Sequence, residues 1–142
     1  MVLDQIRNKL VIEKKSLLHN ELIPHEKVSK KGINQLNNYI SNIRPEIILP
    51  SILICKETNV IIDGHHRFHA LKLLNIDLIP VSLIDYNSDL ILTNEENSIS
   101  KKEIIDSAQN KTIFPTRTSK HTINFKNHNF PIIIISDLRV IN

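Results

Sequence analysis

Apolar and polar positions repeat along this chain with two different periods, and each period predicts one kind of element. In residues 30–43 the apolar side chains recur three or four positions apart, with Ser29 just before them and Pro45 just after. This spacing predicts an amphipathic helix that Ser29 caps and that ends before Pro45. Residues 65–76 repeat the helical spacing and predict a second helix with one apolar face.

Runs of β-branched residues predict the strands. The run 47–55 is followed by a polar turn and by the apolar residues 60–63, which together indicate two strands joined by a tight connection. Residues 79–86 predict the strand after the second helix, and residues 130–138 predict a last strand or buried extended segment. The order strand, helix, strand indicates a mixed α/β fold in which helices flank a small mixed sheet.

One more short helix is predicted near the middle of the chain. Residues 98–111 carry apolar positions at helical spacing, and either Ser98 or Ser100 can cap their start. No repeat or linker divides the 142 residues, so we expect one compact domain over residues 1–142.

Composition adds expectations about the environment of the protein. The lone Cys55 lies in an apolar run, which excludes an intrachain disulfide and favours a small core residue in a reducing compartment. The first residues lack the pattern of a signal peptide, and no apolar run has the length of a membrane span. We therefore expect a soluble, cytoplasmic protein with no membrane partner.

The charge of the chain argues against a nucleic-acid partner. The net charge is +3, but the lysines occur as scattered pairs rather than as a basic stripe. Tryptophan is absent and the chain has only four phenylalanines, so stacking platforms for bases are scarce. A lysine-rich surface of this kind is typical of a solvated face.

The segment "DGHHR", residues 63–67, stands between an apolar strand and an amphipathic helix. Gly64 permits a tight backbone turn at which the first N–H groups of the helix point outward toward an anion. Arg67 adds a forked cation, and His65 or His66 can donate hydrogen bonds to phosphate oxygens. Asp63 fits the same site if a divalent cation or a hydroxyl-bearing substrate also binds there.

A purely structural interpretation of this turn is also open. Asp63 could cap the helix, Arg67 could pair with Asp63 or Asp85, and a histidine could lie on the surface. Five consecutive residues of these types nevertheless favour a functional turn. His65 and His69 have the spacing of a zinc pair, but no third ligand follows at a suitable distance, so zinc is not expected.

Three segments together resemble a known family. Residues 59–86, "NVIIDGHHRFHALKLLNIDLIPVSLIDY", resemble the core of the ParB/sulfiredoxin-like superfamily and, more closely, its free L-serine kinases, whose phosphate-binding turn reads Asp-Gly-His-His-Arg. "LIPHE", residues 22–26, resembles their Pro-His-Glu segment. "FPTRTSKHTINF", residues 114–125, resembles their C-terminal Lys-Thr-Thr-Arg-His segment. The three segments occur in the same order as in that family.

The resemblance implies Mg²⁺-dependent transfer of a phosphoryl group from an adenine nucleotide to L-serine, giving O-phospho-L-serine in cysteine and serine metabolism. It implies that Glu26 is the base and that Asp63 positions the substrate or Mg²⁺. The residues implied to cradle the nucleotide phosphates are Gly64, His65, His66 and Arg67. Those implied to hold the amino acid are Arg117, Thr118, Ser119 and His121.

Several alternatives remain at this point. His25 either orients Glu26 or is an exposed loop histidine. The connection from Tyr86 to Lys111 is shorter than in larger kinases of the family, and Arg117 and Lys120 exchange the family's lysine and arginine. ATP is favoured over ADP as donor, while the acceptor and the oligomeric state stay open.

The alternative function is a ParB-like nucleotide- or DNA-binding module without kinase activity. A sulfiredoxin activity is not expected, because the turn has His65 where that chemistry needs a cysteine.

Overall fold

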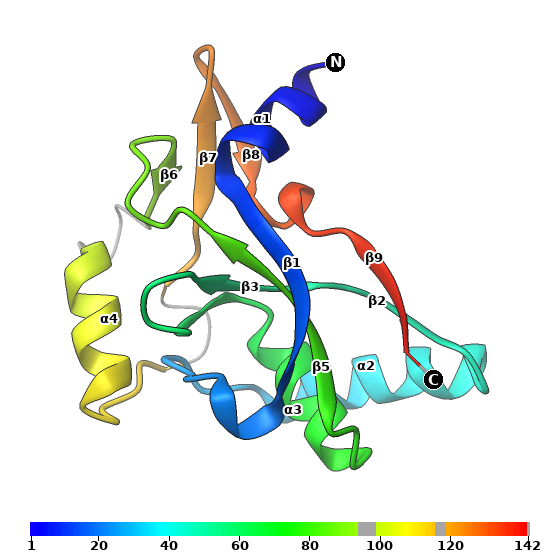
Figure 1. Ribbon diagram of the computed structural model, residues 1–142. Coiled ribbons are helices and arrows are strands. Elements are labelled where there is room, and N and C mark those ends of the chain that lie inside the picture. The colour runs from blue at the N-terminus through cyan, green and yellow to red at the C-terminus, as the bar shows by residue number, and fades with distance from the viewer. Residues whose placement is uncertain (94–98, 116–118, 142) are drawn as a thin grey trace.

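A four-stranded mixed sheet lies at the centre of the molecule (Figure 1). The computed structural model describes residues 1–93, 99–115 and 119–141. The strand order is β1 (Val11–Leu18), β5 (Leu78–Ile84), β3 (Ile52–Cys55) and β4 (Ile61–Asp63). β5 pairs antiparallel with β1 and parallel with β3, and β3 pairs antiparallel with β4. The parallel pair joins β3 to β5, which are separated along the chain by β4 and the helix that follows it.

Two smaller sheets lie beside the central one. The first pairs β2 (Ile47–Pro50) with β9 (Leu138–Ile141) in antiparallel fashion. The second consists of β6 (Ile91–Leu92), β7 (Thr122–Phe125) and β8 (His128–Pro131), all antiparallel. The β7–β8 hairpin lies near α1 (Val2–Leu10) at one end of the molecule (Figure 1).

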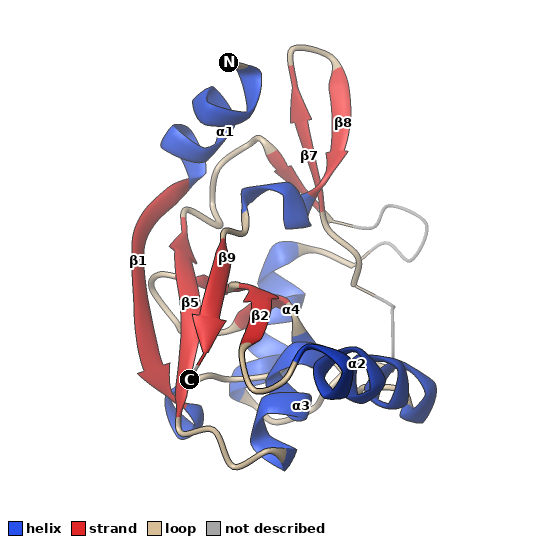
Figure 2. Ribbon diagram, turned by 90° about the vertical axis from the view of Figure 1, so that its right-hand side faces the viewer, coloured by secondary structure: helices blue, strands red, loops and turns tan. Residues whose placement is uncertain are grey.

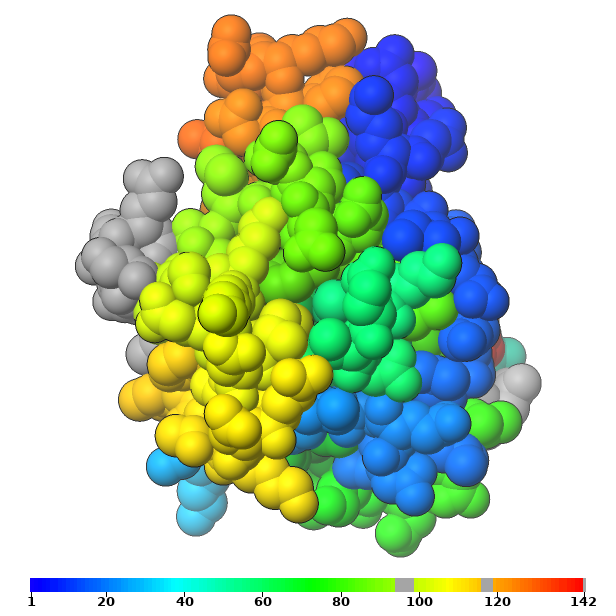
Figure 3. Space-filling model, turned by 60° about the vertical axis from the view of Figure 1, so that its left-hand side comes forward, coloured from blue at the N-terminus to red at the C-terminus, as the bar shows by residue number. Residues whose placement is uncertain are grey.

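The remaining helices cover the central sheet. They are α2 (Lys30–Ile43), α3 (His65–Leu73), α4 (Lys101–Gln109) and the short 3₁₀ turns η1 (His19–Glu21) and η3 (Ile132–Ile135). α2 and α3 lie together at the end opposite α1 (Figure 2). α4 lies beside the turn that joins β3 to β4 (Figure 3). No helix in the described part of the chain is long and apolar enough to cross a membrane.

Both faces of the central sheet are buried at β3, as the alternation along this strand shows. Ile52 and Ile54 belong to the apolar cluster that contains Phe68 of α3. Leu53 and Cys55 belong to the opposite cluster, which contains side chains of α1, α4 and β7. Because successive side chains of a strand point to opposite faces, one short strand anchors both clusters. Cys55 is a buried core residue with a free thiol, as expected.

The predicted mixed α/β class and all three predicted helices are confirmed. α2 occupies residues 30–43, and Oγ of Ser29 caps it by accepting a hydrogen bond from the N–H of Gly32 at 2.9 Å. α3 begins at the predicted position. Ser100 caps α4 through a capping box with Glu103, whereas Ser98 lies outside the described residues.

Two of the strand predictions are wrong in detail. Run 47–55 breaks at Ser51 into β2 and β3, because β2 leaves the central sheet to pair with β9. Residues 130–138 include the 3₁₀ turn η3, in which the buried Ile132 and Ile135 are three positions apart and therefore share one face. The pattern predicted neither α1 nor β1.

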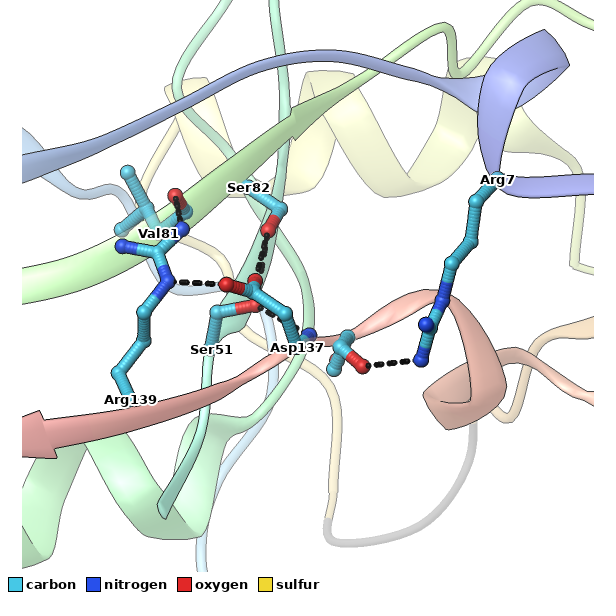
Figure 4. A network of polar contacts seen from close by, with 7 residues as sticks. Arg7, Ser51, Val81, Ser82, Asp137 and Arg139 are labelled. Carbon is cyan, nitrogen blue, oxygen red and sulfur yellow. Dashed lines mark hydrogen bonds and ion pairs between the residues drawn. The ribbon is translucent and has the colours of Figure 1, made fainter. Parts of the chain in front are cut away.

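A polar network holds β9 and β2 against the central sheet (Figure 4). Ser51 Oγ lies 2.8 Å from Ser82 Oγ, and the Ser82 hydroxyl donates to Asp137 Oδ1 at 3.1 Å. Arg139 Nε donates to Asp137 Oδ2, and Arg139 Nη2 donates to the carbonyl of Val81 at 3.2 Å. We call Ser51, Ser82, Asp137 and Arg139 the strand-junction network.

Candidate active site

A pocket of about 370 Å³ lies where β4 ends and α3 begins. Its walls are formed by Glu26, Ile62, Asp63, Gly64, His65, His66, Arg67, Ser119, Lys120 and His121. Every site residue predicted from the sequence that the structure describes is in this set. Arg117 and Thr118 lie outside the described residues. Residues from three segments far apart in the sequence therefore meet at one pocket.

Gly64 forms the turn between β4 and α3 and is the N-cap residue of the helix, so Asp63 does not occupy that position. Its φ of 114° is left-handed, and a Cβ atom there would lie 2.8 Å from Nη2 of Arg67 and 3.1 Å from Ile52. Glycine is thus required twice, for the backbone conformation and for the close approach. Phe68 makes the first helical hydrogen bond, to the Gly64 carbonyl at 2.9 Å. The amides before it carry the positive end of the helix dipole to the pocket.

Arg67 is held against the pocket wall by two contacts. Nη2 donates to the carbonyl of Ser51 at 3.2 Å and lies 3.4 Å from Oδ2 of Asp63. The pairing with Asp63 that the structural interpretation foresaw is therefore present. Nε of Arg67 is buried and has no hydrogen-bond partner among the described residues. The guanidinium group is consequently positioned but incompletely satisfied.

His65 and His66 are both fixed by backbone amides. Nε2 of His65 accepts the N–H of His25 at 3.0 Å, so His65 carries its proton on Nδ1. Burial lowers the pKa of His65 well below its ordinary value, and the nearby His25 adds to this. Nε2 of His66 accepts the N–H of Ser29 at 3.1 Å, which ties α3 to the start of α2.

The segment that carries Glu26 lies between β4 and the segment around Phe114. Ile23 forms a parallel bridge with Val60, beside β4. Glu26 forms a second bridge with Phe114, in which Phe114 N–H donates to the His25 carbonyl at 2.8 Å. Backbone pairing on both sides therefore fixes the direction of the Glu26 side chain at the pocket.

Ser119 connects Glu26 to His25. Oγ of Ser119 lies in short contact with Oε2 of Glu26 and 2.6 Å from Nε2 of His25. Nδ1 of His25 lies 2.5 Å from the carbonyl oxygen of Ile61. The His25 side chain is fully buried, so it is not an exposed loop histidine. Burial lowers its pKa, while the Ile61 carbonyl and the charge of Glu26 act in the opposite direction.

His121 closes the inner side of the pocket. Its Nε2 lies 2.8 Å from the hydroxyl of the buried Tyr86, two residues after the end of β5. Burial, followed by the neighbouring His25 and Lys101, lowers the pKa of His121 to about 3. Burial also raises the pKa of Tyr86. The sequence offered no signal for Tyr86, because its partner is 35 residues away.

The charges at the pocket suit a metal–nucleotide complex. Glu26 and Asp63 supply carboxylates, and Arg67 and Lys120 supply cations. In the ranges that the structure describes, no group of three or more histidine, cysteine or acidic side chains converges on a metal position. Mg²⁺ commonly uses one or two carboxylates together with water and substrate phosphates, so Asp63 fits as its protein ligand. Lys120 lines the pocket although no role was predicted for it.

The sequence matches no family model. It is 37% identical over 79 residues to a curated "ParB-like protein" of Sulfolobus acidocaldarius, and the match covers 56% of this chain and 38% of that protein. The chain thus spans less than half the length of the curated relative.

Solved structures resemble the chain over a larger share of its length. A free serine kinase in complex with AMP superposes with a TM-score of 0.68 and 12% identity, over 85% of this chain and 92% of that one. A glutamate-to-alanine variant of free serine kinase with ADP gives a TM-score of 0.69 at 11% identity. A conserved hypothetical protein from Pyrococcus furiosus gives 0.52 at 20% identity, over 59% of this chain. The expected ParB-like fold, of the free serine kinase type, is therefore confirmed.

Proposed function

We propose that this protein is a phosphotransferase that moves the terminal phosphoryl group of an adenine nucleotide to the hydroxyl of L-serine, giving O-phospho-L-serine. One observation supports this most strongly. A single pocket unites a carboxylate, a helix N-terminus with an arginine, and the segment that includes Ser119 and His121. The fold shared with free serine kinases bound to AMP and ADP gives further support.

The helix N-terminus is the proposed phosphate site. Gly64 lets the backbone approach an anion closely, and the first-turn amides of α3 supply hydrogen-bond donors. Arg67 and Lys120 place positive charge at the same pocket, where negative charge moves during phosphoryl transfer. Asp63 would hold Mg²⁺, which would supply further positive charge for the phosphates. His65 and His66 complete the cradle by fixing the start of the helix to its neighbours.

Glu26 is the proposed base for the substrate hydroxyl. Its carboxylate lines the pocket that the phosphate turn forms, and backbone bridges fix its position. A carboxylate held next to the attacking hydroxyl can accept the proton as the oxygen–phosphorus bond forms. Ser119 holds Oε2 of Glu26 through both its amide and its hydroxyl.

The segment 117–121 is the proposed amino-acid site. Ser119 and His121 line the pocket, and Lys120 between them does so too. Arg117 and Thr118 keep the role that the sequence resemblance implies, which is to hold the carboxylate and hydroxyl region of serine. Substitution of Arg117 or His121 by alanine is expected to raise the KM for serine more than the KM for nucleotide.

Direct product detection tests the proposal. The purified protein is incubated with L-serine, Mg²⁺ and either ATP or ADP, and O-phosphoserine is measured by mass spectrometry. If ADP is the donor, the nucleotide product is AMP, and if ATP is the donor, the product is ADP. ATP and ADP are therefore both tested as donors. We expect product with at least one nucleotide and almost none from Glu26→Gln. Absence of product with both nucleotides, in a protein that is folded, would contradict the proposal.

The second candidate is a ParB-like nucleotide-binding module without kinase activity; the curated relative is described as a "ParB-like protein". Both candidates use the phosphate site, but only the kinase uses Glu26 as a base. A binding module is expected to be stabilised by nucleotide but to make no phosphoserine, and Glu26→Gln would then change nothing measurable.

A further inference from the structure

His25, Ser119 and Glu26 form a chain of hydrogen-bonding groups in which the number of protons is the informative quantity. Ser119 Oγ contacts His25 Nε2 at 2.6 Å and also contacts Oε2 of Glu26. The carbonyl oxygen of Ile61, on the far side of His25, can only accept a hydrogen bond, so Nδ1 of His25 must carry a hydrogen.

With His25 neutral and Glu26 ionised, the hydrogen-bonded chain of His25, Ser119 and Glu26 has one proton fewer than its contacts require. Nε2 of the neutral imidazole is an acceptor, and so is the carboxylate. Both face Ser119 Oγ, whose hydroxyl has a single hydrogen, so one of the two contacts lacks a proton. One added proton completes both contacts. It can reside on His25, which then donates to Ser119, or on Glu26, with the direction of both bonds reversed.

The surroundings keep His25 and Ser119 away from solvent, while Glu26 lines the pocket. His25 is fully buried and Ser119 is 3% exposed. The titratable groups that face His25 are His65, at 4.5 Å between ring centroids, and His121, at 6.3 Å. Burial lowers the pKa of both rings, so they are neutral neighbours that neither supply nor remove a proton near pH 7. The charged groups on the pocket side are Asp63, Arg67 and Lys120.

We infer that Ser119 and His25 extend the base, so that the proton released by the substrate hydroxyl passes through Glu26 and comes to rest on His25. This inference rests on the proposed function. The bond between the substrate oxygen and the terminal phosphorus forms while the bond from that phosphorus to the departing nucleotide oxygen breaks. The hydroxyl proton goes to Glu26, which passes a proton to Ser119 Oγ.

The hydroxyl hydrogen of Ser119 then moves to Nε2 of His25. Glu26 is again a carboxylate, and His25 is an imidazolium. After the products leave, its proton returns through Ser119 and Glu26 to solvent in the pocket. Each group loses every proton that it gains in a turnover, so the step balances. Ser119 and His25 are positioning residues for this proton path, because of the three groups only Glu26 takes the proton directly from the substrate hydroxyl.

The test is the pH dependence of kcat in three variants. Ser119→Ala removes the link, Ser119→Thr keeps a hydroxyl, and His25→Gln keeps an amide near Nε2 but cannot take up a proton. We expect kcat to fall about tenfold to a hundredfold in Ser119→Ala and His25→Gln, with the KM for nucleotide unchanged. The acidic limb of the profile should move to lower pH, toward that of an isolated carboxylate, and Ser119→Thr should restore the wild-type profile.

Two results would overturn the inference. The first is a wild-type kcat and acidic limb in Ser119→Ala or His25→Gln, given that wild-type protein makes phosphoserine. The second needs no turnover and so separates this inference from the proposed function. Nitrogen-15 NMR of the histidines should show a hydrogen on Nδ1 of His25, and its Nε2 should take up a proton at higher pH in wild type than in Glu26→Gln. Identical titration of His25 in both proteins would show that His25 is not coupled to Glu26 through Ser119.

Discussion

Two arginine–aspartate pairs in this molecule look alike but differ in how completely they are satisfied. Arg67 and Arg139 each donate to a backbone carbonyl at 3.2 Å and each pair with a nearby aspartate. Asp137 also accepts a hydrogen bond from Ser82, and Arg139 contacts it closely. Asp63 instead lies 3.4 Å from Arg67, whose Nε has no partner in the part of the chain that the structure describes. The Arg139–Asp137 pair is therefore fully hydrogen-bonded, whereas the Arg67–Asp63 pair retains unused hydrogen-bonding capacity beside a pocket.

This difference separates a structural polar cluster from a candidate binding site. Burial raises the pKa of Asp137, but the hydrogen bonds from Arg139 and the serines outweigh it and lower that pKa to about 2. The network therefore stays charged and fixed. At the pocket, burial leaves His65 and His121 neutral. A neutral cluster beside an incompletely paired arginine is suited to receive the charge of a ligand.

The largest expected effect concerns the pocket. Glu26→Gln should reduce kcat by about 100-fold to 10,000-fold, because a general base contributes that much to proton transfer. The side chain is nearly isosteric, so the unfolding midpoint and the nucleotide affinity should remain close to wild type. Steady-state kinetics and thermal unfolding of both proteins check this. Near-normal turnover in the variant would remove Glu26 from its role.

The next effect concerns the strand-junction network. Arg139→Ala should lower the free energy of unfolding by about 2–3 kcal/mol, because it removes hydrogen bonds to a charged group and leaves Asp137 without its cation. Turnover per folded molecule should not change. Urea unfolding measures the loss, and a variant with reduced kcat at full stability would show that the two regions are not separate.

Acid should affect the two regions in different pH ranges. The pKa of His121 is lowered to about 3, so protonation opposes folding once the pH falls below its unfolded-state value. The free energy of unfolding is thereby lowered by about 2 kcal/mol at about pH 5. The pKa of Asp137 is lowered as well, so its contribution is present above about pH 4 and disappears only as the pH falls toward about 2.

Unfolding of His121→Gln and Asp137→Asn as a function of pH separates these contributions. The first variant should lose stability less steeply between about pH 7 and 5. The second should be less stable than wild type above about pH 4 and should show a flatter loss below it. Equal slopes for His121→Gln and wild type above pH 5 would mean that this ring is not neutral in the folded protein.

A smaller effect is expected at the contact between α2 and α3. A Cβ atom on Gly32 would lie 2.4 Å from Cδ2 of His66, so Gly32→Ala forces that ring away from Ser29. We expect a loss of about 1–2 kcal/mol despite the better helix propensity of alanine. Asn38→Ala, at an exposed position of the same helix, is the matched control and should not destabilise. Equal stability of the two variants would contradict the close contact.

Local patterns were sufficient to predict the elements that position the phosphate turn. The spacing in residues 30–43, the cap at Ser29 and the glycine before His65 are all encoded within a few residues of where they act. The break at Ser51 was not predictable in this way, because its amide donates to Asp137, 86 positions later in the chain. A continuous apolar run does not indicate which strand each of its halves will pair with.

The candidate site shows the same division. The residues of "DGHHR" and "LIPHE" could be identified from the sequence, and the structure places all of "DGHHR" and Glu26 of "LIPHE" at one pocket. The burial and protonation of His25 could not be predicted from the sequence, because they depend on Ser119, 94 residues away, and on the carbonyl of Ile61. Sequence patterns thus indicated which residues to consider, while proton positions and charge required the folded arrangement.

The most direct test of the phosphate site compares nucleotide-induced stabilisation in Arg67→Ala and Arg139→Ala. A ligand that binds only the folded protein raises its unfolding midpoint, so the rise reports binding without requiring turnover. Wild type and Arg139→Ala should both show a clear rise with Mg²⁺ and ATP or ADP, although Arg139→Ala starts from a lower midpoint. Arg67→Ala should start close to wild type and show little or no rise. An undiminished rise in Arg67→Ala would contradict the assignment of this turn as the phosphate site.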